Sequence, residues 1–91
     1  MSYHLTEIPR GVYGEISKIE EELAELKDAE MQRCKIMVLC ELSDLLGAIE
    51  GYLKKHHPDV NFGDIMLMQQ ITARAFESGS RKNKDDASQP I

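Results

Sequence analysis

Five acidic residues with regular spacing are the side chains of this sequence best suited to chemistry. The segment EELAE contains Glu21, Glu22 and Glu25, and the segment ELSD contains the remaining two, Glu41 and Asp44. On an α-helix, residues three positions apart share one face, so Glu22 pairs with Glu25. Glu41 pairs with Asp44 for the same reason. Each segment therefore presents two carboxylates on one side of a helix.

The two carboxylate pairs are placed symmetrically about residue 33. Glu22 and Asp44 are each 11 residues from that position, and Glu25 and Glu41 are each 8 residues from it. If the chain reverses there, two antiparallel helices bring all four carboxylates together. Oxygen ligands of this kind select hard divalent cations, Mg²⁺ first and Mn²⁺ next. The spacing therefore predicts a shared metal site.

The second carboxylate pair lies in an otherwise apolar stretch. The segment KIMVLCELSDLLGAI, residues 35–49, is apolar on nearly all sides of a helical wheel. Such a helix is buried on more than one side, where an uncompensated carboxylate is unfavourable. Either motif alone is more typical of a solvated helix face. The apolar setting together with the symmetric spacing favours the metal site.

Helical signals dominate the rest of the chain, and strand signals are weak. Apolar residues recur at intervals of three and four from Ile16 to Leu26, which indicates an amphipathic helix. We expect an all-α fold, an antiparallel helical bundle of three to four helices per chain. The predicted helices are one from about Glu15, one over roughly residues 34–56, and one from Asn61 or Asp64 to about Ser78.

One helix boundary is not marked by the residue types. Between Lys27 and Lys35 there is no glycine or proline, so local propensity alone allows one helix of about 40 residues. Usual helix lengths favour two shorter helices instead. The carboxylate spacing also favours a hairpin, because one straight helix would hold the acidic groups far apart.

The length of the chain predicts a single small domain. The chain has 91 residues, near the lower end of sizes that hold an independent core. We expect one domain over residues 1–79 and a polar, disordered tail over residues 80–91. A chain this short often gains core by oligomerising, since two half-covered faces bury each other.

Charge and composition exclude several classes of protein. The net charge of −5 argues against a nucleic-acid groove, which normally requires a basic patch. Residues 1–10 lack the features of a signal peptide, and no apolar stretch is long enough to span a bilayer. Cys34 and Cys40, the two cysteines, are expected to be reduced core residues. A cytoplasmic protein without nucleic-acid or membrane partners is the expectation.

Other catalytic and metal-binding patterns are missing from the sequence. No histidine follows a glutamate by three residues, which excludes the Glu-x-x-His pattern of di-iron bundles. The cysteines and histidines do not have the short spacing of a zinc site. The sequence also contains no P-loop, no G-x-G-x-x-G motif and no nucleophile elbow.

The two acidic motifs together resemble those of the MazG-like all-α nucleoside triphosphate pyrophosphohydrolases, whose superfamily includes the dimeric dUTPases and phosphoribosyl-ATP pyrophosphatases. The segment ELSDLLGAIEGYL is similar to the family stretch E-E-L-G-D-L-L, with Ser43 in place of the usual glycine. TARAFESGSRK is similar to the C-terminal part of small phage and bacterial members, so the resemblance covers roughly residues 14–82. The positions that match E-E-x-x-E and E-x-x-D are Glu21, Glu22, Glu25, Glu41 and Asp44.

The resemblance implies a helical bundle that assembles as a homodimer or homotetramer. It implies hydrolysis of (d)NTPs to the monophosphate and pyrophosphate with Mg²⁺, or with Mn²⁺ in its place. Glu21 would be a supporting or water-orienting carboxylate. The implied metal ligands are Glu22, Glu25, Glu41 and Asp44.

Three basic residues are candidates for binding substrate phosphates. Lys18 lies on the same stripe as Glu22, where it either neutralises a carboxylate or contacts a phosphate. Lys54 is explained more readily as a favourable charge at a helix C-terminus. Arg74 lies in the middle of the third predicted helix. The alternative function is a non-catalytic helical interaction or nucleotide-binding module whose acids are surface charge.

Overall fold

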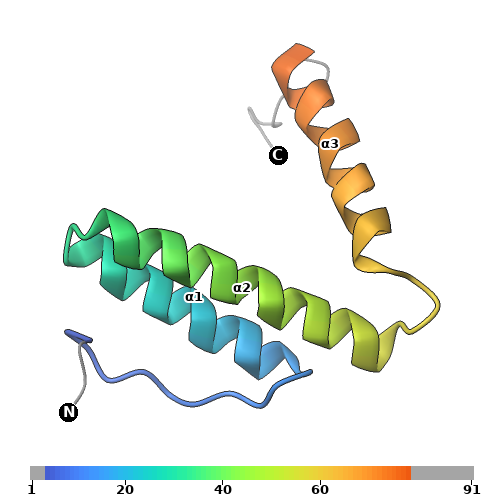
Figure 1. Ribbon diagram of the computed structural model, residues 1–91. Helices are drawn as coiled ribbons and strands as arrows, with labels where there is room; N and C mark the ends of the chain where they lie inside the picture. Colours follow the sequence, from blue (N-terminus) through green and yellow to red (C-terminus); the bar gives the residue numbers. More distant parts are fainter. Residues whose placement is uncertain (1–3, 79–91) are drawn as a thin grey trace. The chain divides into compact units, whose positions relative to one another are not determined.

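The computed structural model describes residues 4–78, which contain helices and connecting segments but no strand. The predicted all-α class is therefore confirmed, while the predicted tail over residues 80–91 lies outside the described residues. No stretch of residues 4–78 forms a helix with the length and apolar character that crossing a bilayer requires. The three helices are α1 (Ile16–Met31), α2 (Lys35–His56) and α3 (Phe62–Ser78) (Figure 1).

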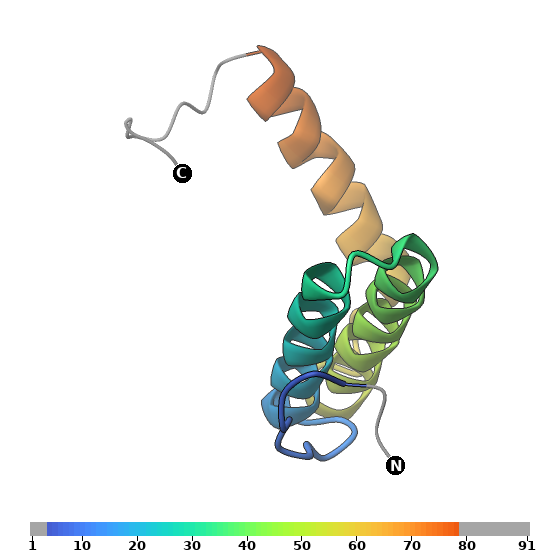
Figure 2. The same cartoon turned by 90° about the vertical axis from the view of Figure 1, so that its left-hand side faces the viewer.

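The chain forms two compact units, one that ends at Val60 and one that begins at Asn61. In the first unit, α1 and α2 lie side by side and antiparallel, as two views at right angles show (Figures 1 and 2). The second unit contains α3. All the acidic motif residues belong to the first unit, which is called the hairpin unit below.

The turn between α1 and α2 explains why the sequence gives no boundary signal. Arg33 adopts a left-handed conformation with φ 56°, and its N–H donates to the Glu30 carbonyl at 3.0 Å. The Cys34 N–H donates to the Ala29 carbonyl at 3.5 Å. These two bonds form the Schellman motif that ends many helices, usually with glycine in the left-handed position. Here an arginine takes that position, so the hairpin forms without a glycine.

Residues 4–12, called the N-terminal segment below, run alongside α1 in the opposite direction (Figure 1). The Thr6 N–H and Oγ1 both donate to Asp28 Oδ2, at 2.8 and 3.0 Å. Further along the segment, the Gly11 N–H donates to Glu21 Oε1 at 2.9 Å. These bonds fix the segment to α1 near both of its ends.

The open end of the hairpin is closed by contacts between the start of α1 and the last turn of α2. Glu15, just before α1, forms an ion pair with Lys55 and lies 3.1 Å from His56 Nε2. Gly51 allows the Tyr13 ring to lie against α2, because an added Cβ would be 2.5 Å from the ring. These contacts hold the two helices in one register.

The hairpin unit buries few apolar side chains and leaves many large ones exposed. Its buried apolar residues are Ala29, Ala48 and Leu53. Cys40 is exposed, so the prediction that both cysteines are core residues is wrong for Cys40 in the single chain. A two-helix hairpin has one buried seam, and the remaining faces of its helices need another partner. The exposed large apolar residues of α1 and α2 include Ile16, Leu23, Ile36, Leu39, Leu42 and Leu46.

The start of α3 is fixed by a reciprocal cap. The Asp64 N–H donates to Asn61 Oδ1 at 2.9 Å, and the Asn61 N–H donates to Asp64 Oδ2 at 3.1 Å. This is the geometry of a capping box, with aspartate in the place of the usual glutamate. Both predicted capping residues therefore take part. The exposed apolar residues of α3 include Met66, Leu67, Met68 and Ile71.

Candidate metal centre

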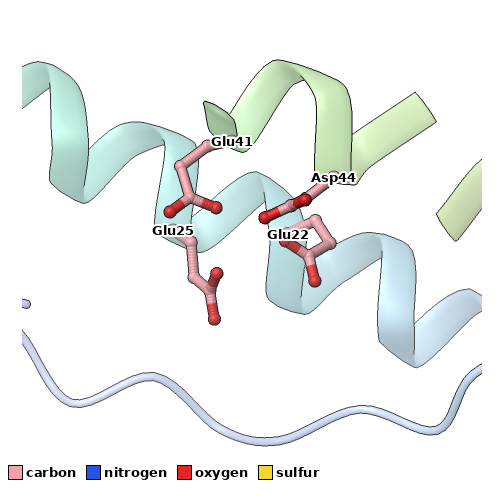
Figure 3. Close-up of side chains that lie close together, drawn as sticks. All are labelled: Glu22, Glu25, Glu41 and Asp44. Carbon is pink, nitrogen blue, oxygen red and sulfur yellow. The ribbon is translucent and has the colours of Figure 1, made fainter. Parts of the chain in front are cut away.

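Four carboxylates from α1 and α2 converge in one cluster, called the acidic cluster below (Figure 3). Its members are Glu22 and Glu25 of α1 and Glu41 and Asp44 of α2. One oxygen from each residue lies within 4.8 Å of the corresponding oxygens of the other three. Two oxygens on opposite sides of one Mg²⁺ are about 4.2 Å apart. Small side-chain adjustments would therefore allow all four to ligate one ion.

Two members of the acidic cluster are deeply buried. Glu22 is 5% exposed and Glu41 is 3% exposed. The Oε1 atom of each is buried and has no hydrogen-bond partner among the described residues. A buried carboxylate oxygen without a partner is strongly unfavourable, and a bound cation would satisfy both atoms. Asp44 is exposed, so the cluster is open to solvent on that side.

The surroundings of Glu25 in the acidic cluster change the pKa of its carboxyl group. Burial of its carboxyl group is the main cause that raises the pKa of Glu25 to about 8. A hydrogen bond to Glu41 and the negative charges of Glu22, Glu41 and Glu21 raise the pKa further. Without metal, Glu25 therefore keeps a proton near neutral pH. Binding of a divalent cation would release that proton.

Lys18 neutralises carboxylates at the edge of the acidic cluster. Its Nζ lies 3.1 Å from Glu21 Oε1 and 3.2 Å from Glu22 Oε2. The hydrogen bond to Glu21 is the main cause that raises the pKa of Lys18. Of the two interpretations of Lys18, its contacts support the neutralisation of carboxylates over contact with a phosphate.

Glu21 lies beside the acidic cluster and binds the N-terminal segment. Its Oε1 accepts hydrogen bonds from the Gly11 N–H and from Lys18. The backbone hydrogen bond from Gly11 is the main cause that lowers the pKa of Glu21. The structure therefore shows Glu21 as an anchor of this segment, and its role in orienting water stays a prediction.

Asp28 is an important acidic residue that the sequence reasoning missed. It is fully buried, and its carboxylate accepts hydrogen bonds from the Thr6 N–H, the Thr6 hydroxyl and the Gln32 amide. Burial alone would raise the pKa of Asp28, but the hydrogen bonds from Leu5, Gln32 and Thr6 hold it well below its usual range. A sequence signal existed, because Asp28 lies three residues after Glu25 and so shares its helix face.

The other two basic candidates are Lys54 and Arg74. Lys54 is exposed in the last turn of α2, with its Nζ 3.9 Å from Glu50 Oε2. It is ten residues beyond Asp44, about 15 Å along the helix axis, so the structure does not bring it to the acidic cluster. Arg74 is exposed on α3, within the other unit. Their roles in binding phosphate stay predictions.

A cleft of about 580 Å³ opens between the N-terminal segment and α1. Glu21 and Glu25 line it from the helix, and Thr6 and Arg10 are among the residues that line it from the segment. Glu25 thus belongs both to the acidic cluster and to the wall of the cleft. A ligand in the cleft would therefore lie next to Glu25, one member of the acidic cluster.

Comparison with models of protein families, with curated proteins and with solved structures found no match to this chain. The functional interpretation therefore depends on the geometry of the acidic cluster.

Proposed function

We propose that this protein is a Mg²⁺-dependent nucleotide pyrophosphohydrolase that converts (d)NTPs to (d)NMPs and pyrophosphate. The observation that carries the proposal is the acidic cluster, in which Glu22 and Glu41 each bury an oxygen without a hydrogen-bond partner among the described residues. The resemblance of its motifs to the MazG-like family supplies the reaction and the substrate class.

The donor set of the cluster fits a hard divalent cation. All four side chains offer carboxylate oxygens, which suit Mg²⁺ and Mn²⁺ better than softer metals. Glu22, Glu25, Glu41 and Asp44 would hold the ion. When bound, the ion supplies the positive charge that polarises a phosphoryl group and lowers the pKa of water.

The residues around the cluster have distinct tasks in this proposal. Glu22 and Glu41 are buried and fix the position of the site, while Glu25 and Asp44 reach its accessible side. Without a cation, the excess of carboxylates repels a triphosphate, so substrate binding depends on metal. Lys18 offsets part of this charge through Glu21 and Glu22.

Assembly as a homodimer or homotetramer is part of the proposal. A stripe of exposed apolar side chains on α2 supports it, since contiguous apolar surface of this kind marks interaction sites. Light scattering on the purified protein measures the oligomer, and a monomer at micromolar concentration would contradict this part. The stripe consists of Ile36, Leu39, Leu42 and Leu46.

The same apolar stripe favours the second candidate function, a non-catalytic helical interaction module. Such a module either binds no nucleotide or binds nucleotide without hydrolysing it. Such a module needs the apolar surface but not the metal. The two candidates therefore differ in whether the protein releases pyrophosphate.

The deciding experiment is an assay of the products formed from nucleotides. The protein is incubated with a mixture of dNTPs and Mg²⁺, and pyrophosphate, orthophosphate and monophosphates are measured. We expect equal amounts of pyrophosphate and monophosphate, no turnover after chelation of Mg²⁺, and recovery with Mn²⁺. Release of orthophosphate alone, or of neither product, would contradict the assigned reaction. A panel of single nucleotides then identifies the preferred base and sugar.

A further inference from the structure

The N-terminal segment crosses the face of α1 that carries the acidic residues. Glu21, Glu25 and Asp28 occupy positions i, i+4 and i+7, so they lie on one side of the helix. Glu21 and Asp28 hold the segment through Gly11 and Thr6. Glu25, between them, belongs to the acidic cluster, and its side chain is directed towards the segment in Figure 3.

The spacing of the two anchors leaves room for a cleft. The helix rises about 10.5 Å from Glu21 to Asp28. The chain from Thr6 to Gly11 reaches up to about 17 Å when extended. The segment is therefore long enough to leave room beside α1, and the cleft of about 580 Å³ lies between them. This volume lies within the range of small-molecule sites, roughly 300–1,000 Å³.

The cleft is lined by three acidic residues and one arginine. Glu21 and Glu25 line it from the helix, and the segment contributes Glu7 together with the guanidinium of Arg10. Arg10 is exposed, and no acidic side chain of residues 4–78 forms an ion pair with it. Lys18, by contrast, is already paired with two carboxylates. Arginine presents a planar set of donors that binds phosphate oxygens in pairs.

We propose that the N-terminal segment is the outer wall of the substrate cleft and that Arg10 binds the triphosphate there. This inference rests on the proposed function and adds to it a binding residue that lies outside both acidic motifs. Arg10 would bind the triphosphate from the segment, and the residues of the acidic cluster would hold the cation on the other side of the cleft. Asp28 and Glu21 are positioning residues, because they hold the segment that carries Arg10.

The test measures binding, so that it does not depend on turnover. Isothermal titration calorimetry is performed with Mg²⁺ and the α,β-methylene analogues of the four common dNTPs, and separately with Mg²⁺ alone. The proteins are the wild type, Arg10→Ala, Arg10→Lys and Lys27→Ala. Lys27 is exposed on α1 and is the matched control, since its substitution also removes one positive charge.

We expect Arg10→Ala to weaken binding of the preferred analogue at least tenfold, and Arg10→Lys to weaken it less. Lys27→Ala should change it by less than twofold. Binding of Mg²⁺ alone should be unchanged in all variants, because Arg10 is not a member of the acidic cluster. Circular dichroism melting should also be unchanged, since Arg10 is exposed.

The outcomes separate this inference from the proposed function. Unchanged analogue binding by Arg10→Ala, in a protein that releases pyrophosphate, overturns the role of Arg10 and leaves the function intact. Arg10-dependent binding in a protein that releases no pyrophosphate supports the cleft and overturns the function. A wild-type protein that binds none of the analogues in the presence of Mg²⁺ overturns the substrate cleft itself.

Discussion

Helix α1 carries two sets of carboxylates with opposite environments. Glu21 and Asp28 accept hydrogen bonds from the N-terminal segment, and the pKa of each lies below its ordinary value. Glu25 lies between them on the same face, yet burial and the neighbouring acids raise the pKa of Glu25 to about 8. Asp28 is more deeply buried than Glu25. Burial alone therefore does not decide the charge of these groups; the supply of donors does.

The difference divides the acids by their hydrogen-bond partners. Asp28 is satisfied by the protein itself, through Thr6 and Gln32. Glu22 and Glu41 keep buried oxygens that no described residue satisfies. The contacts of Asp28 stabilise the folded chain, whereas in the proposed function Glu22 and Glu41 bind a cation. Neutral substitutions in the two sets should therefore have opposite consequences.

The largest effect is expected from neutralising the acidic cluster. Glu41→Gln keeps the shape of the side chain but removes the negative charge of one proposed metal ligand. We expect kcat/KM for pyrophosphate release to fall at least 100-fold, about 2.7 kcal/mol of transition-state stabilisation. Thermal stability without Mg²⁺ should stay equal or rise, because the substitution removes one negative charge from the acidic cluster.

The control for this substitution is Glu20→Gln, at an exposed position of α1. It should leave both turnover and melting unchanged. A large loss of thermal stability in Glu41→Gln would show that Glu41 is a structural acid, and the distinction between the two sets would then be wrong.

A neutral substitution in the other set should act on stability. In Asp28→Asn, only one side-chain oxygen remains to accept the bonds now made by the Thr6 N–H, the Thr6 hydroxyl and the Gln32 amide. We expect the melting temperature to fall by on the order of 10 °C, because buried donors lose their acceptor. Circular dichroism melting measures the effect, with the exposed Glu30→Gln of the same helix as the control. An unchanged melting temperature would mean that the Thr6 contact contributes little.

The hairpin and the acidic cluster were predictable because both follow from periodicity. The helical repeat places Glu22 with Glu25 and Glu41 with Asp44, and the mirrored spacing about residue 33 gives the register. No local signal marks the turn, since Arg33 occupies a position where glycine is usual. The constraint from the carboxylates therefore located the turn better than the turn residues did.

The N-terminal segment was not predictable in the same way. The Thr6–Asp28 and Gly11–Glu21 contacts join an irregular segment to a helix, and no repeat in the sequence specifies such a pairing. Periodicity also identifies which faces are apolar without saying what covers them. Leu23 and Leu42 belong to apolar stripes, yet both are exposed in the single chain.

The two sets of carboxylates should also respond to pH in opposite directions. The raised pKa of Glu25 means that the unfolded chain loses this proton near pH 4.5 and the folded chain near pH 8. Stability without metal should therefore fall as the pH rises through this window. The lowered pKa of Asp28 acts the other way, so stability should fall as the pH drops through and below 3.8. Melting curves from pH 3 to pH 9 measure both changes in stability. The highest melting temperature is expected at roughly pH 4–5.

Measuring Mg²⁺ binding as a function of pH tests the protonation of Glu25 directly. Because the ion displaces the Glu25 proton, its affinity should rise roughly tenfold per pH unit below pH 8. The stabilisation by Mg²⁺ should therefore increase with pH. Glu25→Gln, which has no proton to lose, is the reference for a flat profile. A wild-type affinity that does not change between pH 6 and pH 8 would contradict protonation of the cluster.

The smallest effect is expected at the turn between α1 and α2, which aligns the two halves of the acidic cluster. The left-handed conformation of Arg33 costs about 1–2 kcal/mol for a residue with a Cβ, while glycine loses about 0.5–1 kcal/mol in backbone entropy on folding. Arg33→Gly should therefore stabilise the hairpin by up to about 1 kcal/mol, a rise of a few degrees in melting temperature. Arg33→Ala keeps the strained conformation and should show no such gain. Mg²⁺ affinity should be the same in all three proteins, because the turn fixes the register of the carboxylates without contacting them. A change in affinity in Arg33→Gly alone would instead show that the strain at Arg33 reaches the acidic cluster.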